Sequence, residues 1–274
     1  MLLAVLLTFA ALVGVGGAAV GQGRDQNLMA CEEAADPDAA IAGCTALIQS
    51  GREAMGSLAS VYFNRGSAYY RKGELDSALA DYDQVIRLDP GYAPAFNGRG
   101  YIRDGRGQSE AAIADYDRAV RLDPGFALAF NNRGYAYYRA GRYDRAIADY
   151  DEAIRLDPDY AGAFNNRCWA RAVGGAPHEA LADCDESLRL RPGAASTLDS
   201  RGFVHLRLDQ PNQAIADYDA ALAVRPGVAS SLYGRGLAYL QLSEPGKGGQ
   251  DIEAARRIDP GITERFRRWG VPGP

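Results

Sequence analysis

Six prolines recur at a constant spacing of 34 residues along most of the chain: Pro90, Pro124, Pro158, Pro192, Pro226 and Pro260. The text around them repeats as well. Residues 93–126 read APAFNGRGYIRDGRGQSEAAIADYDRAVRLDPGF, and residues 127–160 read ALAFNNRGYAYYRAGRYDRAIADYDEAIRLDPDY. A fixed period of this size is typical of a protein that stacks copies of one supersecondary unit. Such an array buries its apolar surface between neighbouring copies and needs no single central core.

Each copy predicts two antiparallel helices joined by a tight turn. Counted from three residues after each proline, the units are 59–92, 93–126, 127–160, 161–194, 195–228 and 229–262. Positions 4, 8 and 11 of a unit, and again 20, 24 and 27, follow helical spacing. Turn-forming residues such as Lys72-Gly73-Glu74 separate the two runs. Proline follows the second run, where it interrupts no hydrogen bond of the helix.

The residue types at these positions resemble the tetratricopeptide repeat family. Position 8 is Gly66, Gly100, Gly134, Cys168, Gly202 and Gly236, and position 24 is Tyr82, Tyr116, Tyr150, Cys184, Tyr218 and Ile252. A large residue at position 4, alanine at position 20 in five copies and proline at position 32 complete the pattern. The resemblance implies an all-α, right-handed superhelical solenoid of antiparallel helix pairs. It also implies a concave groove, lined by first helices, that binds a protein or an extended peptide.

The four cysteines are expected to form two disulfides. Cys168 and Cys184 replace the small residue at position 8 and the aromatic residue at position 24 of one unit. If those residues touch in the other units, the two sulfurs face each other. Cys44 also falls at position 24 of a shortened unit, and Cys31 lies on the matching helix face. Catalytic or metal-binding thiols are the alternative, but the chain has two histidines in all and neither lies near these cysteines.

The segments outside the six repeats are predicted to be a secretory signal and one cap at each end of the repeat array. Residues 1–21 contain no charged side chain and read as a secretory signal, with an uncleaved membrane anchor as the alternative. Residues 22–58 are expected to form a degenerate N-terminal capping repeat, and residues 263–274 a C-terminal cap or tail. The tail carries Phe266 and Trp269, which either cover the last apolar face or dock a neighbour. Because the signal and the even number of cysteines both indicate export, the chain is expected in a bacterial periplasm or outside the cell.

Composition and motifs argue against chemistry or nucleic-acid binding. The formal net charge of −5 does not suit a protein that follows phosphates. No nucleotide-binding, zinc-protease or nucleophile motif occurs, so neither an enzyme nor a cofactor or metal is expected. The recurring Asp-Tyr-Asp motif does not form a carboxylate pair, because residues two apart on a helix do not face each other. Arginine at position 7 and aspartate at position 23 in every unit predict instead a structural Arg–Asp ladder.

The family resemblance also implies which residues line the groove and contact a partner. Positions 5 and 9 of the first helices form a row of amides beside a row of aromatic rings, a combination that suits an extended peptide. The residues expected to contact a partner are Asn97, Asn131, Asn165, Tyr101, Tyr135 and Trp169. Alternatively, the rings pack between repeats and the amides only solvate the groove. The expected function is a scaffold or adaptor. The alternative function is a membrane-anchored accessory subunit of a cell-envelope assembly that acts by oligomerisation.

Overall fold

The structure, a computed structural model, describes residues 25–274, and these residues are helical with no strand. The predicted signal or anchor at residues 1–21 lies outside the described residues. Residues 25–33 form a helix that precedes α2 (Pro37–Ser50). No helix of residues 25–274 has the length and the apolar character that crossing a membrane requires.

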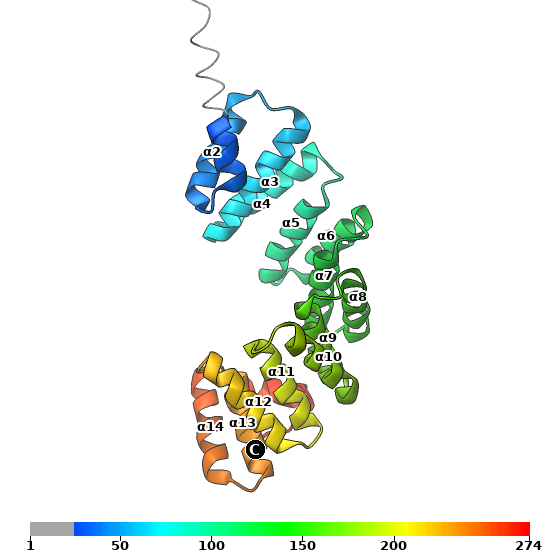
Figure 1. Cartoon of the computed structure of the whole chain (residues 1–274), viewed down its shortest axis with the longest axis vertical. Coiled ribbons are helices and arrows are strands. Elements are labelled where there is room, and N and C mark those ends of the chain that lie inside the picture. Colours follow the sequence, from blue (N-terminus) through cyan, green and yellow to red (C-terminus); the bar gives the residue numbers. More distant parts are fainter. Residues whose placement is uncertain (1–24) are drawn as a thin grey trace, which may run out of the picture. The chain divides into compact units, whose positions relative to one another are not determined.

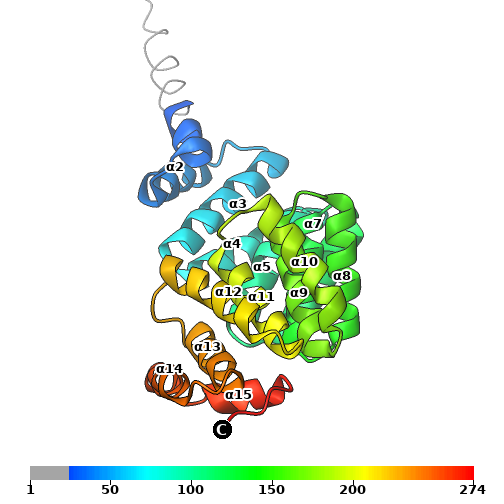
Figure 2. The ribbon, with the colours of Figure 1, turned by 60° about the horizontal axis from the view of Figure 1, so that its bottom comes forward.

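The helices follow one another as antiparallel pairs within two compact units that divide after Arg106 (Figure 1). The N-terminal unit also contains α3 (Met55–Lys72), α4 (Leu75–Leu88) and α5 (Ala93–Gly105). The C-terminal unit, Gly107–Pro274, contains α6 (Ser109–Leu122), α7 (Ala127–Arg139), α8 (Tyr143–Leu156), α9 (Ala161–Gly174), α10 (Pro177–Leu190), α11 (Ala195–Arg207), α12 (Pro211–Val224), α13 (Ala229–Gln241), α14 (Pro245–Ile258) and α15 (Ile262–Arg268). In that unit α7 to α10 lie side by side (Figure 2). The predicted all-α repeat solenoid is confirmed.

The turn inside each repeat depends on one residue with left-handed backbone. This residue is Gly73, Gly107, Gly141 or Gly175 in the first four repeats, with φ between 73° and 101°. Asp209 and Ser243 take the same place in the last two repeats, with φ of 57° and 60°. Glycine adopts this region without a steric cost, whereas a side chain makes it less favourable. The turn is therefore conformationally least costly in the first four repeats.

The contact expected between positions 8 and 24 is present in the repeats. A Cβ atom built on Gly134 would lie 2.8 Å from Tyr150 Cε1, and one built on Gly202 would lie 3.0 Å from Tyr218 Cε1. The glycine thus allows the tyrosine ring of the second helix to lie directly on the backbone of the first. Because these rings are almost fully buried, the contact forms the core of the repeats that have a tyrosine at position 24.

The two predicted disulfides are confirmed. Cys31 pairs with Cys44 across a Cα–Cα distance of 4.6 Å, and Cys168 pairs with Cys184 across 5.4 Å. The second bond joins α9 to α10 at the place where other repeats have a glycine against a tyrosine. All four cysteines are therefore structural, and the described residues contain no group of three or more ligands that could hold a metal ion.

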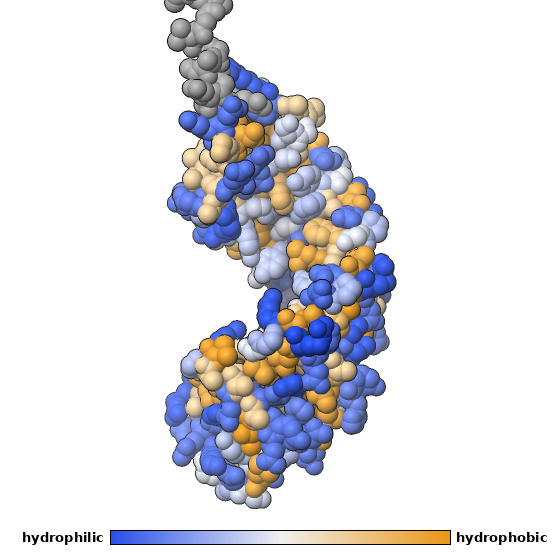
Figure 3. Space-filling view, viewed as in Figure 1, coloured by the Kyte–Doolittle hydropathy of each residue, from blue (hydrophilic) through white to orange (hydrophobic). Residues whose placement is uncertain are grey.

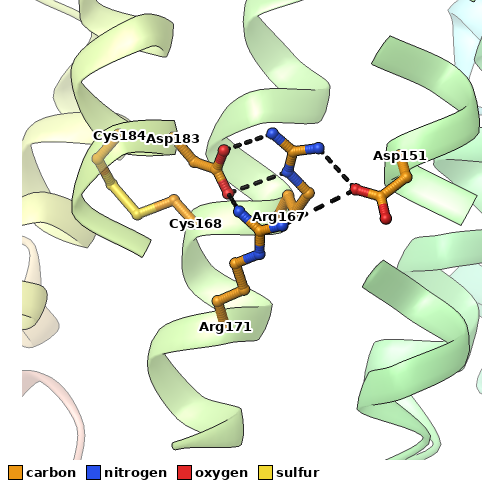
Figure 4. Close-up of polar contacts among 6 residues, drawn as sticks. All are labelled: Asp151, Arg167, Cys168, Arg171, Asp183 and Cys184. Carbon is orange, nitrogen blue, oxygen red and sulfur yellow. Dashed lines mark hydrogen bonds and ion pairs between the residues drawn. A yellow bond between two sulfur atoms is a disulfide. The ribbon is translucent and has the colours of Figure 1, made fainter. Parts of the chain in front are cut away.

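The Arg–Asp ladder is also confirmed, and it explains the whole Asp-Tyr-Asp motif. Arg167 donates two hydrogen bonds to Asp183 of its own repeat, Nε to Oδ2 at 3.0 Å and Nη2 to Oδ1 at 2.5 Å. Its Nη1 donates to Asp151 of the preceding repeat at 2.6 Å (Figure 4). The first aspartate of the motif thus pairs with the arginine of its own repeat, and the second aspartate pairs with the arginine of the next repeat. The same arrangement occurs at Arg133, Arg201 and Arg235.

Candidate functional site

The predicted binding residues differ in how much of each side chain is accessible. Tyr101 and Tyr135 are 50% and 45% exposed, whereas Asn97 and Asn131 are buried at 9% and 8%. Asn165 and Trp169 are half-buried. The rings at position 9 therefore offer more surface to a partner than the amides at position 5. These residues belong to α5, α7 and α9, which are first helices of their repeats.

One of the buried amides links neighbouring repeats. Asn131 Oδ1 on α7 accepts a hydrogen bond of 2.9 Å from Asn166 Nδ2 on α9. This bond orients the Asn131 side chain toward the next first helix and occupies its acceptor. A partner in the groove would meet this amide only at a small exposed edge, so Asn131 has a structural role whether or not it also binds.

In each unit an exposed tyrosine packs against a second tyrosine ring. In the N-terminal unit Tyr70 on α3 and Tyr101 on α5 pack edge to face, with ring centroids 5.6 Å apart. Burial, and then the hydrogen bond with Tyr101, raises the pKa of Tyr70 to about 12, so the Tyr70 phenol stays protonated at neutral pH. In the C-terminal unit Tyr135 lies 6.1 Å from Tyr138 on the same helix. On the face of the molecule that Figure 3 shows, polar and apolar residues are interspersed.

Trp169 lies in an aromatic cluster that the C-terminal segment, residues 262–274, completes. The ring centroids of Phe203 and Trp269 both lie 4.9 Å from that of Trp169. Trp169 Nε1 donates to the Tyr138 hydroxyl at 2.6 Å. Phe266 on α15 is 1% exposed and packs against Phe203 and Tyr233.

The C-terminal segment therefore lies across the first helices of the last three repeats. Trp269 contacts Trp169, which belongs to the repeat at 161–194. Arg207 on α11 secures the segment, because its Nη1 donates to the backbone oxygen of Trp269 at 2.7 Å. The segment covers more than the final apolar face: it covers part of the predicted binding row. Spacing in the sequence does not show where this segment lies. Of its residues only Phe266 fits the repeat pattern, at position 4 of a unit that would begin at residue 263.

A cavity of about 240 Å³ opens beside this cluster and is named here the Asp199 pocket. Its lining includes Asn165 and Trp169 on α9, Ser196 and Asp199 on α11, Ser230 on α13, and Trp269. The Asn165 side-chain oxygen is buried and accepts no hydrogen bond from the described residues. Two predicted residues, Asn165 and Trp169, thus meet here with residues not singled out from the sequence. The signal for Asp199 was its place at position 5, where three preceding repeats have asparagine.

Asp199 is a half-buried carboxylate that receives neutral donors. Ser231 Oγ donates to its Oδ1 at 2.5 Å, and Ser230 Oγ donates to its Oδ2 at 3.1 Å. Burial raises the pKa of Asp199, and the two serine hydroxyls and the charge of Arg225 only partly oppose this shift. The charged form is therefore less stable in the folded protein than in water.

Replacing Asp199 with asparagine is expected to stabilise the protein at neutral pH. The folded-state pKa of Asp199 lies above the ordinary 3.8, so its protonated form favours folding, and stability falls as the pH rises through the folded pKa. Arg225, Tyr218 and the two serines surround this carboxyl in both forms. The stability advantage of D199N over the native protein should shrink as the pH is lowered toward 4. Urea denaturation at a series of pH values measures this difference. An advantage that is independent of pH would contradict the prediction.

Sequence comparison identifies the repeats. The family model described as tetratricopeptide repeat matches residues 97–161, 131–195 and 201–261, and a second model with the same description matches residues 59–92. The chain belongs to the tetratricopeptide repeat family. Proteins of this family are in general non-catalytic scaffolds for protein interactions. No curated protein sequence matches the chain.

Solved structures of other tetratricopeptide repeat proteins share the fold. A tetratricopeptide repeat protein from Parabacteroides merdae aligns with a TM-score of 0.68 at 17% identity, over 93% of this chain and 100% of its own. PilW, a widely conserved type IV pilus biogenesis factor, aligns with a TM-score of 0.67 at 20% identity, over 77% of this chain and 97% of its own. YrrB, which has an unusual peptide-binding site, aligns with a TM-score of 0.52 at 19% identity, over 69% of this chain and 98% of its own.

Proposed function

We propose that this protein is a non-catalytic scaffold that binds an extended segment of a partner protein on its first helices. An exposed ring at position 9 carries the proposal in each unit: Tyr101 on α5 of the N-terminal unit and Tyr135 on α7 of the C-terminal unit. Tyrosine offers a large rigid contact area at little cost in side-chain entropy. Family membership supports a scaffold, and the peptide-binding site of YrrB supports a peptide as the partner.

Two disulfides support a place outside the cytoplasm. Cys31–Cys44 and Cys168–Cys184 account for every cysteine of the chain. Protein disulfides persist in oxidising compartments and are rare where glutathione and thioredoxin keep thiols reduced. We therefore propose that the scaffold acts in the periplasm or outside the cell, in agreement with the signal expected from residues 1–21.

Truncating the exposed tyrosines is expected to weaken capture of the partner. Crosslinking in the native cell envelope, followed by mass spectrometry, would identify the protein bound by the native chain. Y101A and Y135A should each reduce its affinity by roughly thirtyfold, the effect of losing an aromatic contact worth about 2 kcal/mol. Helix content should not change, because both rings project from the surface. Titration of the purified partner measures the effect.

Val224→Ala is the matched control for this experiment. Val224 is exposed at the end of α12, a second helix, so V224A removes apolar surface away from the first helices. It should leave partner affinity unchanged. Equal affinity of Y101A, Y135A and the native chain would refute the proposal. If the chain were recovered uncleaved and only with detergent, the membrane-anchored accessory subunit would become the better description.

A further inference from the structure

We propose that the Asp199 pocket binds a cationic side chain, lysine or arginine, of the partner segment. This inference deepens the proposed function and rests on it, because it assigns the chemistry of one residue in the bound segment. It concerns the C-terminal unit alone, since Asn165, Trp169, Asp199 and Trp269 all lie in Gly107–Pro274.

The first reason is a buried acidic group whose charge the protein compensates only in part. Asp149, Asp183 and Asp217 are buried, and each receives a forked pair of hydrogen bonds from an arginine. Asp199 instead receives two serine hydroxyls, and Arg225, the arginine that lines its pocket, opposes the effect of burial on Asp199 only in part. A charge withdrawn from water usually has a counter-charge in a native protein. A cation entering the pocket would complete this compensation.

The second reason is a second acceptor at the same cavity. The side-chain oxygen of Asn165 is buried and accepts no hydrogen bond from the described residues, although it lines the same cavity as Asp199. A lysine ammonium has three donors and a guanidinium has five, so either group can donate to the carboxylate and to the amide together. A neutral apolar side chain would leave the Asn165 oxygen without a donor and would bring no positive charge to Asp199.

The third reason is the aromatic wall. Trp169 and Trp269 line the pocket, and their rings meet at an interplanar angle of 89°. Cations are attracted to the faces of aromatic rings, and tryptophan attracts them most strongly. The apolar stem of lysine or arginine also packs well on such surfaces.

The pocket contains its own reporter. Trp169 and Trp269 are the two tryptophans of the chain, and both line this cavity. Their intrinsic fluorescence therefore reports occupation of the pocket without any label. Acetylated tripeptide amides of the form Ala-X-Ala are suitable probes, with lysine, arginine or norleucine as X. Norleucine keeps the apolar stem of lysine and lacks the charge.

We expect the full-length chain to bind the lysine or the arginine peptide at least tenfold more tightly than the norleucine peptide. The ratio of the lysine and arginine affinities shows which cation fits. D199N should lose most of this preference, because its side chain has the same shape and no charge, whereas the Asn165 oxygen and the tryptophan rings remain. Glu179→Gln is the matched control: Glu179 is exposed on α10, and E179Q makes the same charge change outside the pocket. E179Q should retain the preference of the native chain.

Three results would overturn the inference: no fluorescence response to either basic peptide, equal binding of the norleucine peptide, or an unchanged preference in D199N. These results are distinguishable from failure of the proposed function. If Y101A and Y135A weaken partner capture while the basic preference is absent, the scaffold proposal stands and the pocket assignment fails. If those two variants bind the partner normally, the scaffold proposal itself fails.

Discussion

The variant Arg133→Ala is expected to lower the free energy of unfolding of the C-terminal unit by about 3–5 kcal/mol. Arg133 donates Nε and Nη2 to Asp149 at 2.8 and 2.6 Å, and Nη1 to Asp117 at 2.7 Å. The Asp149 side chain is 8% exposed, and within residues 25–274 Arg133 is the cation that pairs with it. Burial already raises its pKa despite the arginine. Removing Arg133 therefore leaves a buried carboxylate without a counter-charge.

Arg167→Ala makes the same change one repeat later and should cost less, about 2 kcal/mol. Its main partner, Asp183, also accepts a 2.7 Å hydrogen bond from Arg171 Nη1 (Figure 4). Asp183 therefore keeps a cation when Arg167 is removed. The two variants together separate loss of a counter-charge from loss of side-chain volume, since both delete the same atoms.

Urea denaturation followed by tryptophan fluorescence measures this difference, because both tryptophans belong to the C-terminal unit. The decisive comparison is R133A against R167A. If the two variants lost equal stability, the ladder would act through packing of the arginine stems alone. If neither lost stability, the pairs would be neutral, as many exposed ion pairs are.

The second large effect is expected from the disulfide between α9 and α10. Replacing both Cys168 and Cys184 with alanine should lower the free energy of unfolding by about 3 kcal/mol, because the bond closes a loop with a sequence separation of 16. The alanines also leave space that a tyrosine ring fills in neighbouring repeats. Thermal and urea denaturation of native and variant proteins under oxidising conditions gives the difference. A reductant should destabilise the native protein more than this variant.

The variant C168G/C184Y is the informative control. It restores the pair found at positions 8 and 24 of other repeats, where Tyr150 lies against Gly134. It should recover part of the stability that the alanine variant loses, because a buried ring replaces the bond. If the alanine variant were as stable as the native protein under oxidising conditions, the disulfide would have no stabilising role. If C168G/C184Y were the least stable protein, the α9–α10 pair would not have the geometry of the other pairs.

Most of the fold was predictable because each repeat is a local structure. The contact between positions 8 and 24, the disulfide that replaces it and the Asp-Tyr-Asp ladder all join residues at most 16 apart or at the same spacing in the next repeat. A constant period makes such contacts visible in the sequence, because every copy has them and a departure such as Cys168 marks a changed contact.

The binding residues were predictable only in part. The sequence placed Tyr101 and Tyr135 in a row with Asn97 and Asn131, but periodicity does not tell how deeply each residue of a first helix is buried. The structure leaves the rings exposed and buries the amides, and it joins Asn131 to Asn166 of the next repeat. Side-chain length does not account for the difference, because Tyr233 at position 5 and Phe203 at position 9 are 0% and 1% exposed; the burial of each residue depends on what packs over it.

The sequence by itself thus determined the solenoid, its register, its disulfides and its ladder, since these depend on contacts that recur with the period. Only the tertiary structure decided where the C-terminal segment lies and what it forms. Trp269 contacts Trp169 across three repeats, and Arg207 holds the backbone of the segment there. These contacts occur once, between residues far apart in the chain, so no repetition reveals them. The Asp199 pocket depends on that single path, because Trp269 forms part of its wall.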